Sequence, residues 1–174
     1  VADLVGDNVG DCAGRGADIF ESTVAENIGA MILGVAIAKA TGNDSWIVFP
    51  LILSSFGIVA SLAGVLCAKM SGVKEDPMRA LNRGFYVSVA LSIVFLAYTT
   101  HATLGDSWLY FFGAGIVGAV IAIAFLFITQ YYTEGIYRPV KSIMQASRTG
   151  SATNIIVGLS VGFETTAMPV IAIA

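Results

Sequence analysis

Four long stretches that lack charged side chains determine what this chain can fold into. Residues 46–68, 84–105 and 107–133 contain no Asp, Glu, Lys or Arg, and residues 149–174 contain only Glu164. Each stretch reaches the roughly 20 residues that a helix needs to cross about 30 Å of hydrocarbon. Only helices and closed barrels satisfy their backbone in lipid, and these stretches lack the alternation of barrel strands. They therefore predict membrane-spanning helices.

The composition supports the same class of protein. Charged residues make up 12% of the 174 residues, whereas a soluble domain carries about 25%. The nine Lys and Arg form no polybasic run, so nothing points to nucleic acid as a partner. The chain has 19 glycines, which let helices approach closely in lipid. We predict an all-α membrane protein, a multi-pass helical bundle.

Five helices are expected, at about residues 1–40, 46–70, 84–104, 107–133 and 149–174. Asp76-Pro77 marks a turn or a helix start before the third helix. Seven of the nine basic residues surround the second and fourth connections, namely Lys69, Lys74, Arg79, Arg83, Arg138, Lys141 and Arg148. The positive-inside rule assigns these two connections to the cytoplasm. The first residue then also lies on the cytoplasmic side.

The cysteines and the chain ends give two smaller expectations. Cys12 and Cys67 have no disulfide or zinc-ligand spacing, and both are expected to be small buried residues. The sequence begins without Met or a signal peptide and ends inside an apolar run. We expect it to be a piece of a longer polypeptide.

Five carboxylates share one face of the first predicted helix. At about 100° of rotation per residue, Asp3, Asp7, Asp11, Asp18 and Glu21 fall within an arc of roughly 80°. At 1.5 Å of rise per residue, Glu21 lies about 15 Å beyond Asp11 along the axis. In water this would be an ordinary solvated face, but here it leads directly into a membrane span. A carboxylate inside a membrane costs a few kcal/mol, so the stripe requires a positive partner.

Divalent cations are the expected partner at the N-terminal end of the stripe. Asp3, Asp7 and Asp11 present oxygen ligands at successive helical turns, and Mg²⁺ prefers carboxylates, waters and phosphate oxygens. Cys12 is the only soft ligand nearby, and the segment contains no His. Zinc and copper are therefore not expected.

Asp18 and Glu21 lie too deep to bind the same metals as Asp11. An intramembrane pair of carboxylates is a candidate for ion transfer. Arg15 can pair with Asp11 or with Asp18, because it lies one turn from each. It is the candidate gate partner between a metal-rich anion site and an acidic ion path.

The residues of this helix also resemble the motif of the membrane-integral, ion-pumping inorganic pyrophosphatases. The matching string is Asp3-x-x-x-Asp7-Asn8-Val9-Gly10-Asp11-x-Ala13-Gly14-x-x-Ala17-Asp18-x-Phe20-Glu21-Ser22. The resemblance continues in Tyr132, in Tyr137-Arg138-Pro139-Val140 and in Thr149-Gly150-x-Ala152-Thr153-Asn154-Ile155-Ile156-x-Gly158. It thus covers both ends of the chain.

The resemblance implies a homodimer of about sixteen-helix chains, of which these 174 residues would supply about a quarter. Its cytosolic site would hold pyrophosphate with several Mg²⁺ ions and lysines, and hydrolysis would drive H⁺ or Na⁺ out of the cytosol. K⁺ and Na⁺ are candidate activators. The expected location is a bacterial plasma (inner) membrane, with the active site facing the cytoplasm.

The motif also assigns roles to individual residues. Asp3 and Asp7 would bind Mg²⁺–pyrophosphate, and Asp11 would be one of two aspartates that hold the attacking water. Asp18 would belong to the gate, and Glu21 would bind the pumped ion. The position of Glu21 is similar to that in sodium pumps and some proton pumps, which favours Na⁺. The second aspartate, the pyrophosphate-binding lysines and the residues that set K⁺ dependence would lie outside this stretch.

A secondary cation transporter or channel is the main alternative. It would use Asp18 and Glu21 as its path and the stretch from Asp3 to Asp11 as a cation vestibule. It gives no reason for three aspartates at one-turn spacing. A structural or assembly subunit, the third possibility, has little use for carboxylates in a membrane. We therefore predict an Mg²⁺-dependent, ion-pumping pyrophosphatase of which this piece alone is catalytically incomplete.

Overall fold

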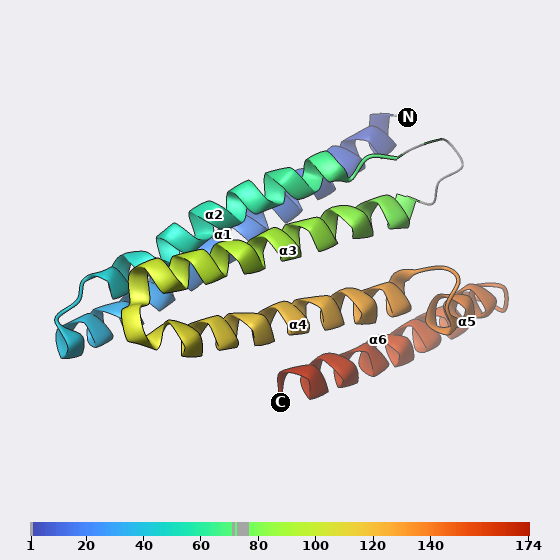
Figure 1. The fold of residues 1–174 in the computed structure, drawn as a ribbon. Coiled ribbons are helices and arrows are strands. Elements are labelled where there is room, and N and C mark those ends of the chain that lie inside the picture. The colour runs from blue at the N-terminus through green and yellow to red at the C-terminus, as the bar shows by residue number, and fades with distance from the viewer. Residues whose placement is uncertain (1, 71, 73–76) are drawn as a thin grey trace. The chain divides into compact units, whose positions relative to one another are not determined.

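A computed structural model describes residues 2–70, 72 and 77–174, and these residues form helices joined by short connections. The elements are α1 (Ala2–Thr41), α2 (Ser45–Cys67), α3 (Pro77–Leu104), η1 (Gly105–Ser107), α4 (Trp108–Thr133), α5 (Arg138–Ser147) and α6 (Ser151–Ile173) (Figure 1). The prediction of an all-α, multi-pass membrane protein is confirmed.

Length and composition identify four helical stretches, among the residues described, that are able to cross a membrane. They are Ala2–Thr41, Ser45–Cys67, Pro77–Ser147 and Ser151–Ile173. The third stretch has 71 residues and is counted as one, although α3 and α4 within it have 28 and 26 residues. The count differs from the five predicted spans because α3 and α4 are joined only by the single turn of η1.

The bounds of α2 and α3 differ from those predicted. α2 ends at Cys67 rather than at residue 70, and α3 begins at Pro77 rather than at residue 84. Proline is favoured in the first turn of a helix because its missing N–H would have no partner there. Of the two interpretations of Asp76-Pro77, a turn or a helix start, the structure thus agrees with the helix start. Val1, Lys74 and Asp76, which also entered the predictions, lie outside the described residues.

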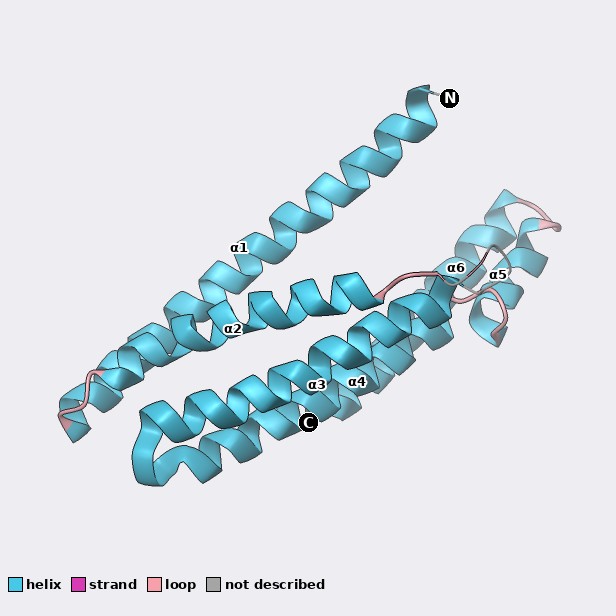
Figure 2. Ribbon diagram, turned by 45° about the horizontal axis from the view of Figure 1, so that its top comes forward, coloured by secondary structure: helices cyan, strands magenta, loops and turns pink. Residues whose placement is uncertain are grey.

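Val1–Phe112 form a first compact unit, in which α1 packs against α2 and α2 packs against α3. Figure 2 shows α2 beside the C-terminal half of α1, while the N-terminal half of α1 extends away from α2. The burial pattern agrees, because residues 2–26 are all exposed whereas Gly34 and Ala38 are buried. α1 therefore has a packed half and a free half within this unit.

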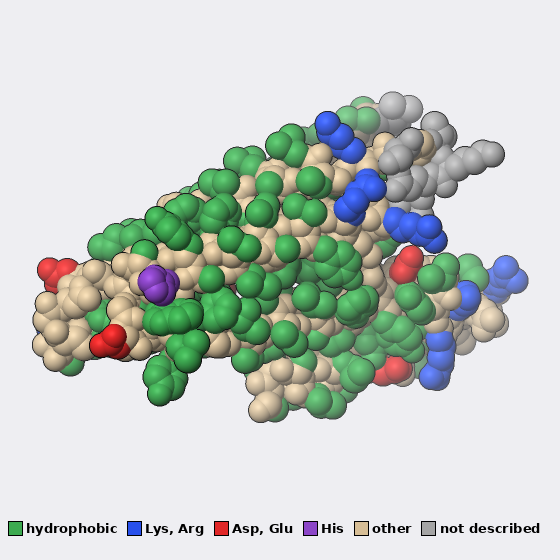
Figure 3. Space-filling model, viewed as in Figure 1, with side chains coloured by type: hydrophobic (Ala, Val, Ile, Leu, Met, Phe, Trp, Pro, Cys, Tyr) green, Lys and Arg blue, Asp and Glu red, His purple; other side chains and the backbone are tan. Residues whose placement is uncertain are grey.

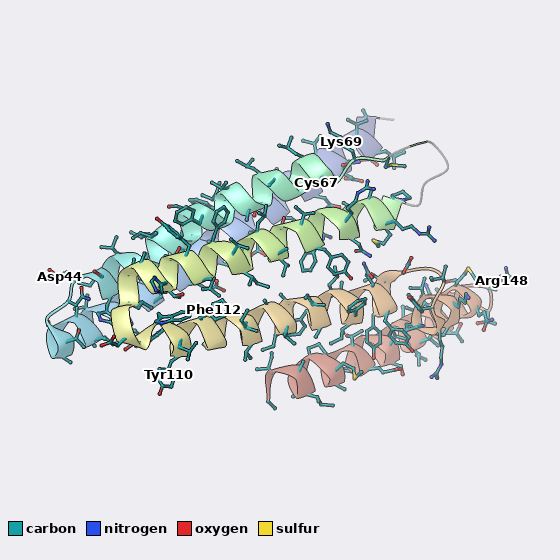
Figure 4. All side chains as sticks on the ribbon, viewed as in Figure 1. Asp44, Cys67, Lys69, Tyr110, Phe112 and Arg148 are labelled. Atoms are coloured by element: carbon teal, nitrogen blue, oxygen red, sulfur yellow. The ribbon has the colours of Figure 1, made fainter. Side chains whose placement is uncertain are left out.

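α2 and α3 approach closely at two glycines. A Cβ atom on Gly84 would lie 2.7 Å from the carbonyl oxygen of Gly64 and 2.8 Å from the Cβ atom of Ala68. At the same end, the Arg83 guanidinium donates to the carbonyl oxygens of Cys67, at 3.3 Å, and Lys69. Figure 4 shows Cys67 and Lys69 where α2 ends, beside the start of α3. Arg83 thus satisfies carbonyl groups that the end of α2 leaves without helical partners.

Gly113–Ala174 form the second compact unit, in which α5 and α6 pack together as a helical hairpin. Gly150 turns the chain between them with φ of 138°, a conformation that residues with a Cβ atom rarely adopt. Ser147 donates to the Asn154 side chain at 3.0 Å, and the hydroxyls of Thr149 and Thr153 lie 2.7 Å apart. The motif residues Thr149, Gly150, Thr153 and Asn154 therefore build this turn.

α5 was not predicted as a helix, because residues 134–148 were interpreted as a connection with basic side chains. Its ten residues are too few to span a membrane. Short helices gain most of their stability from packing of one face. Pro139 lies in the first turn of α5, and Pro139 and Ala146 are buried. The sequence signal of a membrane span could not reveal such a helix.

The predicted burial of the two cysteines is wrong. Cys12 and Cys67 are both exposed. Cys12 lies in the free half of α1, and Cys67 is the last residue of α2.

On the face drawn in Figure 3, hydrophobic side chains cover the lengths of the helices, while Lys and Arg gather in the first unit near the end of α2 and the start of α3. This distribution fits apolar spans with basic residues at their ends.

Candidate active site on the first helix

α1 carries all five carboxylates of the predicted stripe on one uninterrupted helix of 40 residues. Asp3, Asp7 and Asp11 follow one another at successive turns of its first half, and all three are exposed. Asp18 and Glu21 continue the stripe toward the apolar half of α1, and they are exposed as well. The helical spacing from which the shared face was predicted is therefore confirmed.

The face around these carboxylates has no neighbour from the described part of this chain. Large apolar residues of the same segment are exposed too, with Leu4 at 73%, Phe20 at 71% and Ile19 at 66%. A Cβ atom on Gly6 or Gly10 would meet no atom of another part of this chain within 4 Å. The chain thus supplies one wall of a site and leaves the acidic face open.

Within residues 2–70, 72 and 77–174, no group of three or more His, Cys, Asp or Glu is arranged to hold a metal ion. The first three aspartates lie along a line rather than around a point, because one helical turn separates each from the next. Carboxylates are hard ligands of the type that Mg²⁺ takes, and Mg²⁺ usually binds one or two of them together with waters and phosphate oxygens. The three aspartates therefore fit a site in which carboxylates and a phosphate ligand together coordinate Mg²⁺. They do not fit a site in which protein side chains alone surround the ion.

Arg15 lies between the two groups of carboxylates and is exposed. Its pairing with Asp11 or Asp18 stays a prediction. The side chain of Cys12 donates to Asn8 Oδ1 at 3.8 Å within the same helix, so this thiol has a local polar contact. Neither residue lies against another element of the first unit.

Sequence reasoning did not single out Glu26. This carboxylate lines a cavity of about 420 Å³ between α1 and α2, together with Thr23, Asn27 and Ser54. Asn27 Oδ1 accepts a hydrogen bond of 2.8 Å from Ser54 Oγ across the two helices. Glu26 and Asn27 are visible in the sequence as polar residues that follow Glu21, but the Ser54 partner of Asn27 on α2 is not, because helical spacing does not reveal contacts between helices.

Glu164, the single charge in α6, is the other carboxylate within a predicted span. Its carbonyl oxygen accepts a hydrogen bond of 3.3 Å from the Tyr132 hydroxyl. Glu164 also lines a cavity of about 280 Å³ in the second unit with Arg138, Ser142 and Ser160. Tyr132 and Arg138, which belong to the motif, therefore lie near Glu164 of α6. Neither residue belongs to α1, which carries the acidic stripe.

Comparisons with known proteins cover the whole chain. A family model described as inorganic H⁺ pyrophosphatase matches residues 1–174. The K(+)-insensitive pyrophosphate-energized proton pump 2 of Moorella thermoacetica is 55% identical, over 100% of this chain and 26% of that protein. The pyrophosphate-energized membrane proton pump 3 of Arabidopsis thaliana is 45% identical, over 100% of this chain and 23% of that protein. The putative K(+)-stimulated pyrophosphate-energized sodium pump of Clostridium tetani is 43% identical, over 100% of this chain and 25% of that protein.

No solved structure matches the chain. The chain spans about a quarter of the length of the curated relatives that it matches. The family match begins before the acidic stripe and extends through α6, so it includes every motif on which the resemblance depended. The chain belongs to the inorganic H⁺ pyrophosphatase family.

Proposed function

We propose that the full-length protein hydrolyses pyrophosphate to two phosphates and couples this reaction to outward pumping of H⁺ or Na⁺ across a membrane. One observation carries the proposal. The five carboxylates from Asp3 to Glu21 share one open face of α1, a helix that continues into a membrane span. The printed names of the relatives, which are pyrophosphate-energized pumps, support pyrophosphate as the substrate.

Asp3 and Asp7 are proposed to hold Mg²⁺ ions that bind pyrophosphate, with Asp11 at the inner edge of the same site. Bound Mg²⁺ would neutralise the phosphate oxygens and polarise the phosphorus centre. Each carboxylate needs to provide only one or two oxygens, because waters and phosphate oxygens complete the preferred octahedron. This requirement agrees with the linear arrangement of the aspartates on α1.

Asp11 is proposed to orient the attacking water. Its carboxylate would accept a hydrogen bond from this water and take the proton as the water oxygen attacks phosphorus. The bridging P–O bond then breaks, and the second phosphate leaves. The partner aspartate and the lysines that bind pyrophosphate are proposed to lie elsewhere in the longer protein.

Asp18 and Glu21 are proposed to form the ion path below this site, with Arg15 as the gate partner. Glu21 lies about 15 Å from Asp11 along the axis, so it cannot touch a phosphate held beside Asp11. Coupling between the two is proposed to pass through α1 itself, which carries both groups on one continuous helix. The position of Glu21 supports Na⁺ as the pumped ion, while the names of the relatives at 45–55% identity support H⁺.

The charge distribution supports an active site that faces the cytoplasm, in a bacterial plasma (inner) membrane. Lys69, Arg79 and Arg83 lie where α2 ends and α3 begins. The N-terminus of α1 lies at the same end of the first unit (Figure 1). Basic residues favour the cytoplasmic side. We further propose a homodimer in which these residues are part of a single transmembrane domain.

Phosphate release from pyrophosphate by the purified full-length protein tests the proposal. The assay contains Mg²⁺, and Na⁺ and K⁺ are varied separately. We expect Mg²⁺-dependent release that is absent from the Asp11→Asn variant, with the response to Na⁺ and K⁺ identifying the activators. If the assembled wild-type protein releases no phosphate at any of these ion concentrations, the proposed function is wrong.

A further inference from the structure

One hydrogen bond joins α1 to α2 through two side chains. Ser54 Oγ donates to Asn27 Oδ1 at 2.8 Å, and Asn27 Nδ2 donates to the carbonyl oxygen of Thr23 at 2.9 Å. Both Asn27 and Ser54 are half-buried. In a membrane, such a bond links two helices at one defined place.

Asn27 also lies at the boundary between the two halves of α1. Every residue from 2 to 26 is exposed, and Asn27 is the first residue of α1 that is not. Further along, a Cβ atom on Gly34 would lie 3.1 Å from the Cα atom of Ile47, so the two backbones are in close contact there. The packed half of α1 therefore begins at the hydrogen bond with Ser54.

The packed face and the acidic face lie on opposite sides of α1. At about 100° per residue, Asn27, Gly34 and Ala38 lie at about 220–260° from Asp3, whereas the five carboxylates lie between 0 and about 80°. α2 therefore contacts α1 from behind the carboxylates. If α1 turned about its own axis, Glu21 and Asp18 would turn with it toward α2.

We propose that Asn27 and Ser54 are positioning residues that fix the rotation of α1 and so keep Asp18 and Glu21 directed away from α2. Apolar contacts alone specify rotation weakly in lipid, because an apolar face is as well accommodated by lipid as by a helix. A side-chain hydrogen bond requires a defined distance and direction, so it specifies the rotation of the helix more strongly. The proposal rests on the proposed function, since it assigns these two residues to the ion path of the same pump.

The chain provides a matched control for this pair. Ser55 is adjacent to Ser54, but its hydroxyl donates to the carbonyl oxygen of Leu51 in its own helix at 2.8 Å. Ser54→Ala and Ser55→Ala therefore remove the same atom from neighbouring positions. Only the first change removes a bond between α1 and α2. Ser54→Thr keeps the hydroxyl and serves as the conservative variant.

The first measurement compares ion uptake with pyrophosphate hydrolysis in inverted vesicles that contain the full-length protein. We expect Ser54→Ala to lower the number of ions moved per pyrophosphate hydrolysed by threefold or more. Ser55→Ala and Ser54→Thr should retain the wild-type ratio. If assembled Ser54→Ala has the wild-type ratio, the positioning role is wrong. If the wild-type protein does not hydrolyse pyrophosphate, the proposed function is wrong instead.

The second measurement reports rotation without using activity. In full-length protein carrying Cys12→Ser and Cys67→Ser, Ser22→Cys introduces a single thiol beside the acidic face of α1. Any other cysteine of the full-length protein is replaced by serine. We expect Ser54→Ala to change the rate of maleimide modification of this thiol at least threefold, whereas Ser55→Ala leaves the rate unchanged. Equal rates in the two variants would overturn the positioning role even if the protein pumps.

Discussion

Replacing Gly84 by alanine is predicted to weaken the contact between α2 and α3. The new Cβ atom would lie 2.7 Å from the carbonyl oxygen of Gly64, whereas ordinary contacts of a Cβ atom begin at 3.4 Å. The two helices would therefore have to separate by about 0.7 Å, because the atoms at this contact are already closely packed. The oxygen belongs to the backbone, so no side-chain rotation can relieve the overlap.

Two effects of opposite sign determine how much Gly84→Ala changes the stability of the protein. Overpacking a close contact costs about 1–3 kcal/mol, while replacing glycine by alanine inside a helix contributes about 0.5–1 kcal/mol of stability. We expect a net loss of up to about 2.5 kcal/mol of stability for Gly84→Ala, using these two ranges. Gly84→Leu adds larger atoms at the same place and should be less stable still.

The assay is thermal unfolding of the full-length protein in detergent, followed by tryptophan fluorescence. Gly57→Ala in α2 is the control, because a Cβ atom there meets no atom of this chain within 4 Å. Its stability should be unchanged or slightly higher. Equal midpoints for Gly84→Ala and Gly57→Ala would refute the proposed close contact of α2 and α3.

Two further predictions concern the acidic stripe of the assembled protein. Asp11→Asn keeps the shape of the side chain but removes the negative oxygen, and it should lower phosphate release by about 10²–10⁴-fold; near-normal turnover would remove Asp11 from its role. Asp7→Ala removes a proposed Mg²⁺ ligand and should raise the Mg²⁺ concentration for half-maximal hydrolysis. An unchanged Mg²⁺ titration would place Asp7 outside the metal-binding residues.

The sequence predicted the class of fold because uncharged stretches of membrane length leave few alternatives. It also predicted the shared face of Asp3, Asp7 and Asp11, since helical rotation depends only on residue number. The site's remaining walls could not be predicted in this way. They depend on which helices pack against the free half of α1, where residues 2–26 are exposed.

Contacts between elements account for the features that the sequence did not predict. At the early end of α2, the carbonyl oxygens of Cys67 and Lys69 accept hydrogen bonds from Arg83, a residue of the next helix. α5 depends on burial of Pro139 and Ala146 in the hairpin with α6. The hydrogen bond between Asn27 and Ser54 joins residues 27 positions apart. None of these contacts produces a periodic signal in the sequence.

Coupling between hydrolysis and ion movement is the central claim, and Glu21 tests it most directly. Glu21 lies about 15 Å from Asp11 along α1, so its removal should leave the chemistry largely intact while interrupting the ion path. The measurement records phosphate release together with uptake of ²²Na⁺ or acidification in the same inverted vesicles, for wild type and Glu21→Ala. We predict that pyrophosphate drives ion uptake in wild type and that Glu21→Ala loses much more uptake than hydrolysis. Normal uptake by Glu21→Ala, or hydrolysis by wild type without any ion movement, would contradict the account.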